Sequence, residues 1–247
     1  MPHHDPLTWT LLAIAAVLVG MAKTGVPGLG ILVVPLVFHA VPDSRLAPAV
    51  LLPLLCVADV AGVAIYRRHA EPARLWRLFP WVVVGMAGGA AALAWLPGTV
   101  LRVTVGVVVL AMAGLHLLRA RLAEGAIPQD WRSALAFGLT AGFATTVANA
   151  AGPVMNLYLL GMGLPKDQFM GTGTWFFLII NLVKVPLYAA QGLFTGDGLL
   201  TDLLVLPGVG LGAWGGRRIY ERLPATWFAR VVMALVIASG LLLVLRA

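Results

Sequence analysis

The chain of 247 residues is 60% hydrophobic and only 11% charged, with a mean hydropathy of +0.94. A soluble domain has too few core positions for so many apolar side chains, so these values exclude one and indicate a polytopic helical membrane protein. The formal net charge of +7 does not indicate nucleic-acid binding, because Lys and Arg in a membrane protein mainly mark its cytoplasmic loops. The single cysteine, Cys56, excludes an intrachain disulfide and suggests no metal cluster.

The first element in chain order is an apolar stretch, residues 7–40, that is interrupted near its middle. The interruption reads KTGVPGLG and combines a lysine with the helix-disrupting residues Gly and Pro. Its two parts, residues 7–22 and 27–39, are too short to cross a hydrocarbon core of about 30 Å comfortably at about 1.5 Å per residue. They predict a hairpin of two short helices that enters and leaves the membrane on one side. A single kinked span stays open as an alternative.

The rest of the chain contains uninterrupted apolar spans and a second broken element. The broken element, residues 133–162, is interrupted at TTVANAAGP. The uninterrupted spans, each long enough for a membrane crossing, are residues 45–66, 75–96, 99–118, 169–191, 199–216 and 225–245. The predicted fold is an all-α polytopic membrane protein in which each half is a broken helical hairpin followed by three transmembrane helices.

The two halves also match residue by residue, which indicates an internal duplication. GMAKTGVPGLG, which starts at residue 20, aligns with GFATTVANAAG, which starts at residue 142. After a short insertion, PWVVVGMAGG matches PGVGLGAWGG. We therefore predict repeats at residues 7–118 and 133–245, joined by a loop at 119–132, in one transporter domain over residues 1–247. The first alignment pairs Gly20 with Gly142, Thr24 with Thr146, Gly30 with Gly152, Asp59 with Asn181 and Tyr66 with Tyr188.

The positions of the basic loops predict that the two repeats have opposite orientations. The loop after the first uninterrupted span contains Arg67 and Arg68, whereas its counterpart QGLFTGDG has no Lys or Arg. One loop later the pattern reverses, because LPGT is nearly neutral and GGRRIYERLP is basic. The positive-inside rule places the basic loops and the central loop in the cytoplasm, with both termini outside. Inverted repeats of this kind are typical of secondary transporters, here in the cell (inner) membrane.

Each break is predicted to form half of a binding site for a small anion. Unpaired backbone groups are tolerated in a membrane only where protein or a water-filled cavity satisfies them. Helix N-termini at a break direct N–H groups and positive dipole ends at a ligand, and Lys23 adds a full positive charge. The alternative is that Gly and Pro merely permit close helix packing. Packing alone does not require Lys23 or Asn149 at these places.

Ionisable residues within apolar segments are costly and therefore functional candidates, and we single out Lys23, Asp59 and Lys184. Asp59 either carries a coupling proton or forms a structural ion pair with a lysine. Lys184 lies about one turn after Asn181 and either faces the cavity or extends to the outer surface. The residues alone leave both questions open.

Three motifs resemble the sulfite exporter TauE/SafE family of membrane permeases. They are GMAKTGVPGLGILVVPL (20–36), AGFATTVANAAGPVMNLYLL (141–160) and LPKDQFMGTGTWFFLIINLVKVPLY (164–188). The order of elements matches over nearly the whole chain, although the other spans match only as generic apolar helices. The resemblance implies export of a small sulfur-containing anion, such as sulfite or an organosulfonate, driven by an ion gradient. It does not distinguish a sulfonate from a carboxylate of similar size.

The resemblance also implies a site between the two breaks near the midplane, with rocking of one repeat against the other to alternate access. Pro27 and Pro153 would fix the turns from break to half-helix, and Asp59 would carry the coupling ion. The residues expected to bind the substrate are Lys23, Thr24, Gly25, Gly28, Gly30, Thr145, Thr146, Asn149, Gly152, Asn156, Thr172, Asn181 and Lys184.

Other classes of function stay open from the sequence. A channel, or a transporter of another small organic anion, would use the same breaks, and a structural subunit would tolerate polar replacements there. A membrane-embedded enzyme needs a nucleophile and base, or carboxylates that bind a metal, and the spans show no such cluster. We therefore predict no enzyme, no cofactor and no metal. The expected partners are a small anion, the lipid bilayer and a coupling ion such as the proton, and a homo-oligomer stays open.

Overall fold

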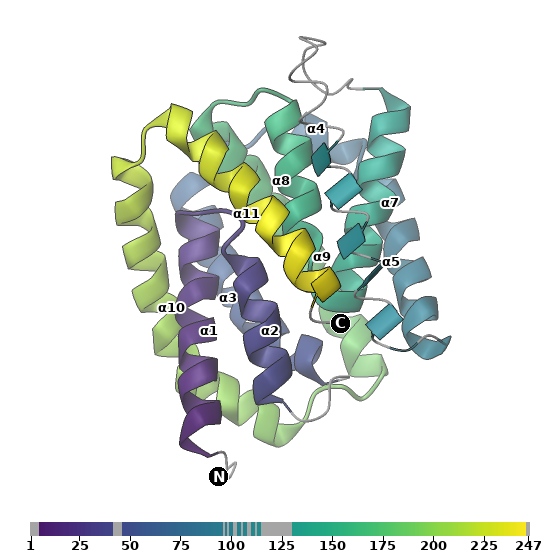
Figure 1. Cartoon of the computed structure of the whole chain (residues 1–247), viewed down its shortest axis with the longest axis vertical. Helices are drawn as coiled ribbons and strands as arrows, with labels where there is room; N and C mark the ends of the chain where they lie inside the picture. The colour runs from purple at the N-terminus through teal and green to yellow at the C-terminus, as the bar shows by residue number, and fades with distance from the viewer. Residues whose placement is uncertain are drawn as a thin grey trace. The chain divides into compact units, whose positions relative to one another are not determined.

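The computed structural model describes residues 5–41, 46–95 and 130–245, and, in the remainder, 97, 99, 100, 103, 104, 106, 107, 110, 111, 113 and 114. Within these residues all regular structure is helical, as predicted, and no strand occurs. The predicted span at 99–118 and the loop at 119–132 lie largely outside the described residues. The helices are α1 (Pro6–Thr24), α2 (Gly30–Ala40), α3 (Ala47–Tyr66), η1 (Arg67–His69), α4 (Pro72–Trp76), α5 (Phe79–Trp95), α7 (Trp131–Ala148), α8 (Ala151–Gly161), α9 (Lys166–Ala190), α10 (Gly196–Arg222) and α11 (Ala225–Leu245) (Figure 1).

Several helices have the length and surface of membrane spans. Within the described part of the chain, α1, α3 extended to His69, α9 and α10 are long and apolar enough to cross a bilayer. Large apolar side chains on α10, such as Leu203 and Leu211, are more than 60% exposed, as expected for a surface that faces lipid. Two exposed tryptophans lie at helix ends, Trp95 at the end of α5 and Trp131 at the start of α7. Tryptophan is enriched where a helix meets the membrane–water interface.

Helix α1 is longer than the sequence predicted. The Asp5 side chain accepts a hydrogen bond from the Thr8 N–H at 3.0 Å and starts the helix at Pro6. The helix then continues through Lys23 and Thr24 and ends at Gly25. At 19 residues it is long enough to span the membrane, so the prediction of a first half that is too short was wrong. Only α2, with 11 residues, is as short as expected.

The break after α1 reverses the chain. Residues 26–29 form a turn with the geometry of type II, because Leu29 N–H donates to the Val26 carbonyl and Gly28, which follows Pro27, has φ +106°. A side chain at position 28 would be strained at this φ, which explains the glycine. Helix α2 then runs back along α1, and its buried Val33 and Val37 join the core that α1 forms with α3 and α10. Figure 1 shows α1 and α2 side by side as a hairpin.

The second uninterrupted span, predicted at residues 75–96, is divided in the structure. Helix α4 ends at Trp76, and α5 starts at Phe79 with Pro80 as its second residue. Proline lacks an N–H donor and restricts the residue before it, so it is favoured in a first turn and disfavoured further along a helix. The prediction of one continuous helix here was wrong at its start.

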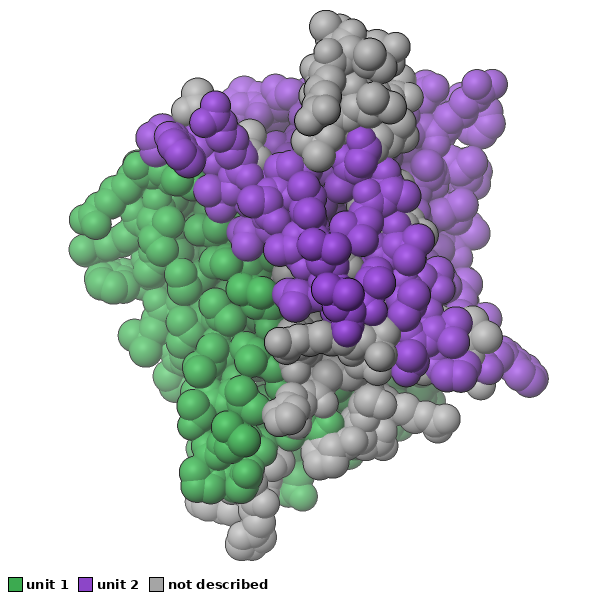
Figure 2. Space-filling view, in the orientation of Figure 1, with its two compact units in different colours: residues 1–70, 174–223 green, residues 71–173, 224–247 purple. Residues whose placement is uncertain are grey.

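The chain folds as two compact units, shown in green and purple in Figure 2. Unit 1 comprises residues 1–70 and 174–223, and unit 2 comprises residues 71–173 and 224–247. Helix α9 contributes to both. Neither unit coincides with a predicted repeat, because each takes helices from both halves of the chain. The single domain and the two repeats therefore stay predictions.

Glycine allows one pair of helices in each unit to pack backbone against backbone. In unit 1, α1 packs against α10, and a Cβ on Gly20 would collide with the Val209 carbonyl. In unit 2, α7 packs against α5, and a Cβ on Gly142 would collide with the Val82 carbonyl. Gly20 and Gly142 are an aligned pair. Gly212, which lies against Val17, and Gly85, which lies against Leu139, are also aligned with each other. The same packing thus occurs twice, with the halves of the chain exchanged.

Candidate functional site

A buried group of polar side chains lies in unit 1 beside the end of α1. Lys23, in the last turn of α1, forms an ion pair with Asp59 of α3, with 2.8 Å between Nζ and Oδ1. Asn181 of α9 donates from Nδ2 to the other carboxylate oxygen, Oδ2, at 2.5 Å. The Asp59 side chain is fully buried, and that of Lys23 is 12% exposed. Lys23 and Asn181 therefore meet at the Asp59 carboxylate, and the sequence had singled out all three residues.

Lys184 adds a second cation to this group. It is fully buried, so the alternative in which it extends to the outer surface does not describe this structure. It lies within electrostatic range of both Lys23 and Asp59. The Lys23 ammonium also lies 3.8 Å from the ring centroid of Phe177, a contact in which the electron-rich face of the ring stabilises a cation. Two lysines and one carboxylate therefore lie in this part of unit 1.

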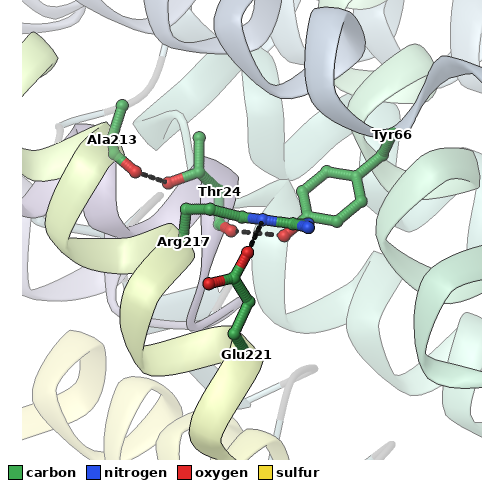
Figure 3. A network of polar contacts seen from close by, with 5 residues as sticks. All are labelled: Thr24, Tyr66, Ala213, Arg217 and Glu221. Atoms are coloured by element: carbon green, nitrogen blue, oxygen red, sulfur yellow. Dashed lines mark hydrogen bonds and ion pairs between the residues drawn. The ribbon is translucent and has the colours of Figure 1, made fainter.

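A second network holds the end of α1 in position (Figure 3). The Tyr66 hydroxyl donates to the Thr24 carbonyl at 2.6 Å, and the Thr24 hydroxyl donates to the carbonyls of Gly20 and Ala213. Tyr66 is 1% exposed, and the Arg217 guanidinium lies 5.3 Å from the centre of its ring. The guanidinium in turn pairs with Glu221 at 2.7 Å. In this arrangement the Thr24 hydroxyl serves helix packing rather than a ligand.

The glycines of the first break have different roles. Gly25 lies against the backbone of Gly216, so its missing side chain is needed for packing. Gly30 would meet only the Ala22 side chain, at 3.7 Å, which leaves room near the start of α2. The residue at the N-cap of α2, Leu29, provides no side-chain cap, and the Leu32 N–H donates to the Leu29 carbonyl. The start of a helix is a place where backbone N–H groups can bind an anion.

The second break lies in unit 2 and is only two residues long. Helix α7 is capped by Asp130, which accepts a hydrogen bond from the Ser133 N–H that lowers the pKa of its carboxyl group. The helix continues through Thr145 and Thr146. Asn149 then adopts a left-handed conformation (φ +50°) and caps the helix through its N–H. The Thr146 hydroxyl donates to the carbonyl four residues earlier at 2.9 Å, as its partner in the alignment, Thr24, also does.

The remaining predicted residues of the second break are in or near α8. Asn156 is 2% exposed, and its side-chain nitrogen has no hydrogen-bond partner among the described residues. Gly152 has open space where a Cβ would lie, and α8, like α2, begins without a side-chain cap. Pro153 lies in the first turn of α8, where its missing N–H costs little. Thr172, also buried, accepts a hydrogen bond from the Glu71 N–H at 3.0 Å.

Comparison with protein families decides the class of this molecule. The model of the family described as sulfite exporter TauE/SafE matches residues 12–243. The chain belongs to the sulfite exporter TauE/SafE family. No curated protein and no solved structure matches the chain. As a member of this family it is an integral membrane protein that transports anions of the sulfite type, and the buried cations of unit 1 are consistent with that class.

One cavity of this TauE/SafE protein lies in unit 2 and has no charged residue in its lining. Its volume is about 460 Å³, and its eight lining residues include Val84, Leu139 and Phe143. The described part of the chain holds no group of three or more His, Cys, Asp or Glu residues that could bind a metal.

Two residues near the site of this TauE/SafE protein, and a third elsewhere in unit 1, were not predicted as site residues. Tyr66 was noticed only as half of an aligned pair, and Phe177 looked like one apolar residue among many. Asp202, in α10, is 4% exposed, and neither carboxylate oxygen has a hydrogen-bond partner among the described residues. Its signal was in the sequence, as an aspartate inside the apolar run LLTDLLVL, but it was not used.

Proposed function

We propose that the protein is a secondary transporter that exports a small sulfur-containing anion, such as sulfite or an organosulfonate, by alternating access. The observation that carries this proposal is the buried group formed by Lys23, Lys184 and Asp59. Removing a charge from water costs several kcal/mol after relaxation, so buried cations are retained where they serve a purpose. The Lys23 and Lys184 ammonium groups can stabilise an anion that binds beside them in this buried place.

Asp59 is proposed as the group that couples transport to protons. While Asp59 is ionised, it forms an ion pair with the Lys23 ammonium and acts as its counter-ion. When Asp59 takes up a proton it becomes neutral, and the ammonium can then bind an oxygen of the substrate. Release of the proton restores the ion pair and expels the anion. The Asn181 amide can donate to the carboxyl group throughout, because a protonated carboxyl still has a carbonyl oxygen that accepts.

The second break is proposed to contribute through Asn156 and the uncapped start of α8. A buried side-chain nitrogen without a partner is costly, and an anion that accepts its hydrogen bond would remove that cost. The repeated packing of glycines in the two units supports an ancient duplication, and opposite orientation of the repeats is part of the proposal. That both breaks line one site also stays a prediction.

Transport into or out of liposomes that contain the purified protein tests the function. Sulfite, sulfoacetate, thiosulfate and acetate are loaded in turn, with and without a proton gradient. Saturable movement of a sulfur anion that follows the proton gradient is expected. Movement that does not saturate and ignores other ion gradients would instead show an anion channel. If acetate alone moves, the substrate is a carboxylate and the sulfur assignment is wrong.

A pair of variants separates an anion-binding role of Lys23 from a structural ion pair. Lys23→Gln removes the cation but leaves Asp59 buried without its partner, which by itself destabilises a protein by about 3–5 kcal/mol. The double variant Lys23→Gln/Asp59→Asn removes both charges and avoids that cost. We expect the double variant to recover protein yield and thermal stability but to transport the anion at less than about a hundredth of the wild-type rate, as loss of about 2.7 kcal/mol would give. Recovery of transport would show that Lys23 only neutralises Asp59.

A further inference from the structure

Asp202 is a buried carboxyl group in the membrane-spanning part of α10 that the anion site does not use. It lies on the buried stripe of α10, one turn before Val205 and two before Val209, both of which belong to the apolar core shared with α1, α2 and α3. The opposite face of the helix carries Leu204 and Leu211, which are 49% and 67% exposed. Snorkelling to water does not explain the residue, because its side chain is only 4% exposed.

Among the described residues, no charged group pairs with the Asp202 carboxylate. Helix α10 packs mainly on α1 and α3. The described charged residues there are Asp5, which caps α1, and Lys23 and Asp59, which pair with each other. Within unit 1, α10 runs parallel to α1, since Gly208 meets Ala16 and Gly216 meets Met21. Lys23 therefore lies near the end of α10 that carries Arg217, whereas Asp202 is near its start. Cations on α10 itself begin at Arg217, four turns further along.

An ionised carboxylate without a partner is too costly in such a place, whereas a protonated carboxyl loses only its hydrogen bonds. We propose that Asp202 is a second proton-binding site of the transporter, protonated in the conformation described here. It gives the proton to water when α10 exposes it and takes up another from water before it is buried again. Each cycle of Asp202 thus moves one proton and leaves the residue unchanged. The protonation of Asp202 does not depend on the proposed function, but the coupling of its proton to anion transport rests on that function.

The protonation state is measured first, without transport. Infrared spectra of the protein in liposomes are recorded for wild type, Asp202→Asn and Asp197→Asn. Asp197 is a matched control, because it lies in the first turn of the same helix and is exposed. We expect the C=O stretch of a protonated carboxylic acid near neutral pH in wild type and Asp197→Asn, and its loss in Asp202→Asn. The same spectrum in all three proteins would overturn the inference, whatever the protein transports.

Transport then shows whether the proton is used. With one proton coupled through Asp202, a pH difference of about one unit supports about a tenfold accumulation of anion. We expect Asp202→Asn to lower the accumulation of sulfite by about tenfold while exchange of sulfite for sulfite, which needs no net proton movement, continues. Unchanged accumulation in Asp202→Asn would overturn the coupling role. If wild type moves no sulfur anion at all, the proposed function fails, and the infrared result alone decides whether Asp202 binds a proton.

Discussion

At the scale of single residues, the site depends on how the last two residues of α1 are held. Lys23 carries the charge, but the backbone that positions it is fixed one residue later, where the buried Tyr66 hydroxyl donates to the Thr24 carbonyl. Carbonyls at the end of a helix lack partners within the helix, so such a bond fixes where the helix stops. The Tyr66 ring packs edge-to-face on Tyr220, with ring centroids 5.2 Å apart, and this contact keeps the hydroxyl in place.

Removal of the Tyr66 hydroxyl should therefore weaken anion binding without unfolding the protein. Tyr66→Phe keeps the ring contact but loses a hydrogen bond worth about 1 kcal/mol. We expect KM for the transported anion to rise by about fivefold, with little change in the maximal rate. Tyr220→Phe is the control, because it removes a hydroxyl from the same cluster and leaves the bond to Thr24 intact. Equal effects of the two variants would show that the Thr24 contact does not position Lys23.

At the scale of helices, close contact between backbones organises each unit. Three glycines of α10 lie against α1 and follow one another at intervals of four residues: Gly208, Gly212 and Gly216. This spacing brings them to one face of the helix. Between them lie Gly210 and Gly215, for which a Cβ would meet nothing within 4 Å. In membranes, small residues on one face of a helix commonly mark where another helix packs, because little hydrophobic force is available between helices.

The two kinds of glycine in α10 should respond differently to the same substitution. Gly212→Ala places a methyl group against the Val17 backbone, and overpacking of this kind costs about 1–3 kcal/mol. Gly210→Ala and Gly215→Ala are expected to be neutral or slightly stabilising, because alanine has the higher helix propensity. Thermal unfolding of the three variants in the same detergent measures the difference. Similar stabilities for all three would contradict the close packing of α1 and α10.

At the scale of the whole molecule, the predicted opposite orientation of the two repeats decides the mechanism. Inverted repeats can exchange conformations and so alternate access, whereas repeats of the same orientation give a different class of transporter. The argument for inversion comes from basic residues in alternating loops. The glycine contacts add that the first helix of each half packs on a helix of the other half, α1 on α10 and α7 on α5.

Single cysteines can report the side on which each loop lies. In a Cys56→Ser background, His69→Cys and Arg222→Cys mark the basic loops, and Pro97→Cys and Gln191→Cys mark the loops that align with them. With a thiol reagent that does not cross membranes, intact cells should label positions 97 and 191. Positions 69 and 222 should be labelled only after the cells are opened. Labelling of 69 and 191 from the same side would exclude inverted repeats.

The sequence determined the helical membrane class, the breaks and the polar residues of the site. Lys23, Asp59, Asn181 and Lys184 were conspicuous because an apolar segment makes each charged or amide group costly and therefore informative. The glycine pattern likewise predicts a duplication, and the aligned glycines lie at equivalent contacts.

Only the tertiary structure decided which partner each group has. It paired Asp59 with Lys23 and Asn181, buried Lys184 and used the Thr24 hydroxyl for packing. It also buried Asp202 without a hydrogen-bond partner among the described residues. It also extended α1 to Thr24, because the cap at Asp5 and the stop at Gly25 depend on local backbone geometry and on the approach of α10. The hydrophobicity of each segment reflects whether lipid or water surrounds it. It can therefore be recognised from the sequence of that segment alone. Hydrogen bonds and ion pairs join residues as far apart as Thr24 and Ala213, and their geometry exists only once the helices have packed.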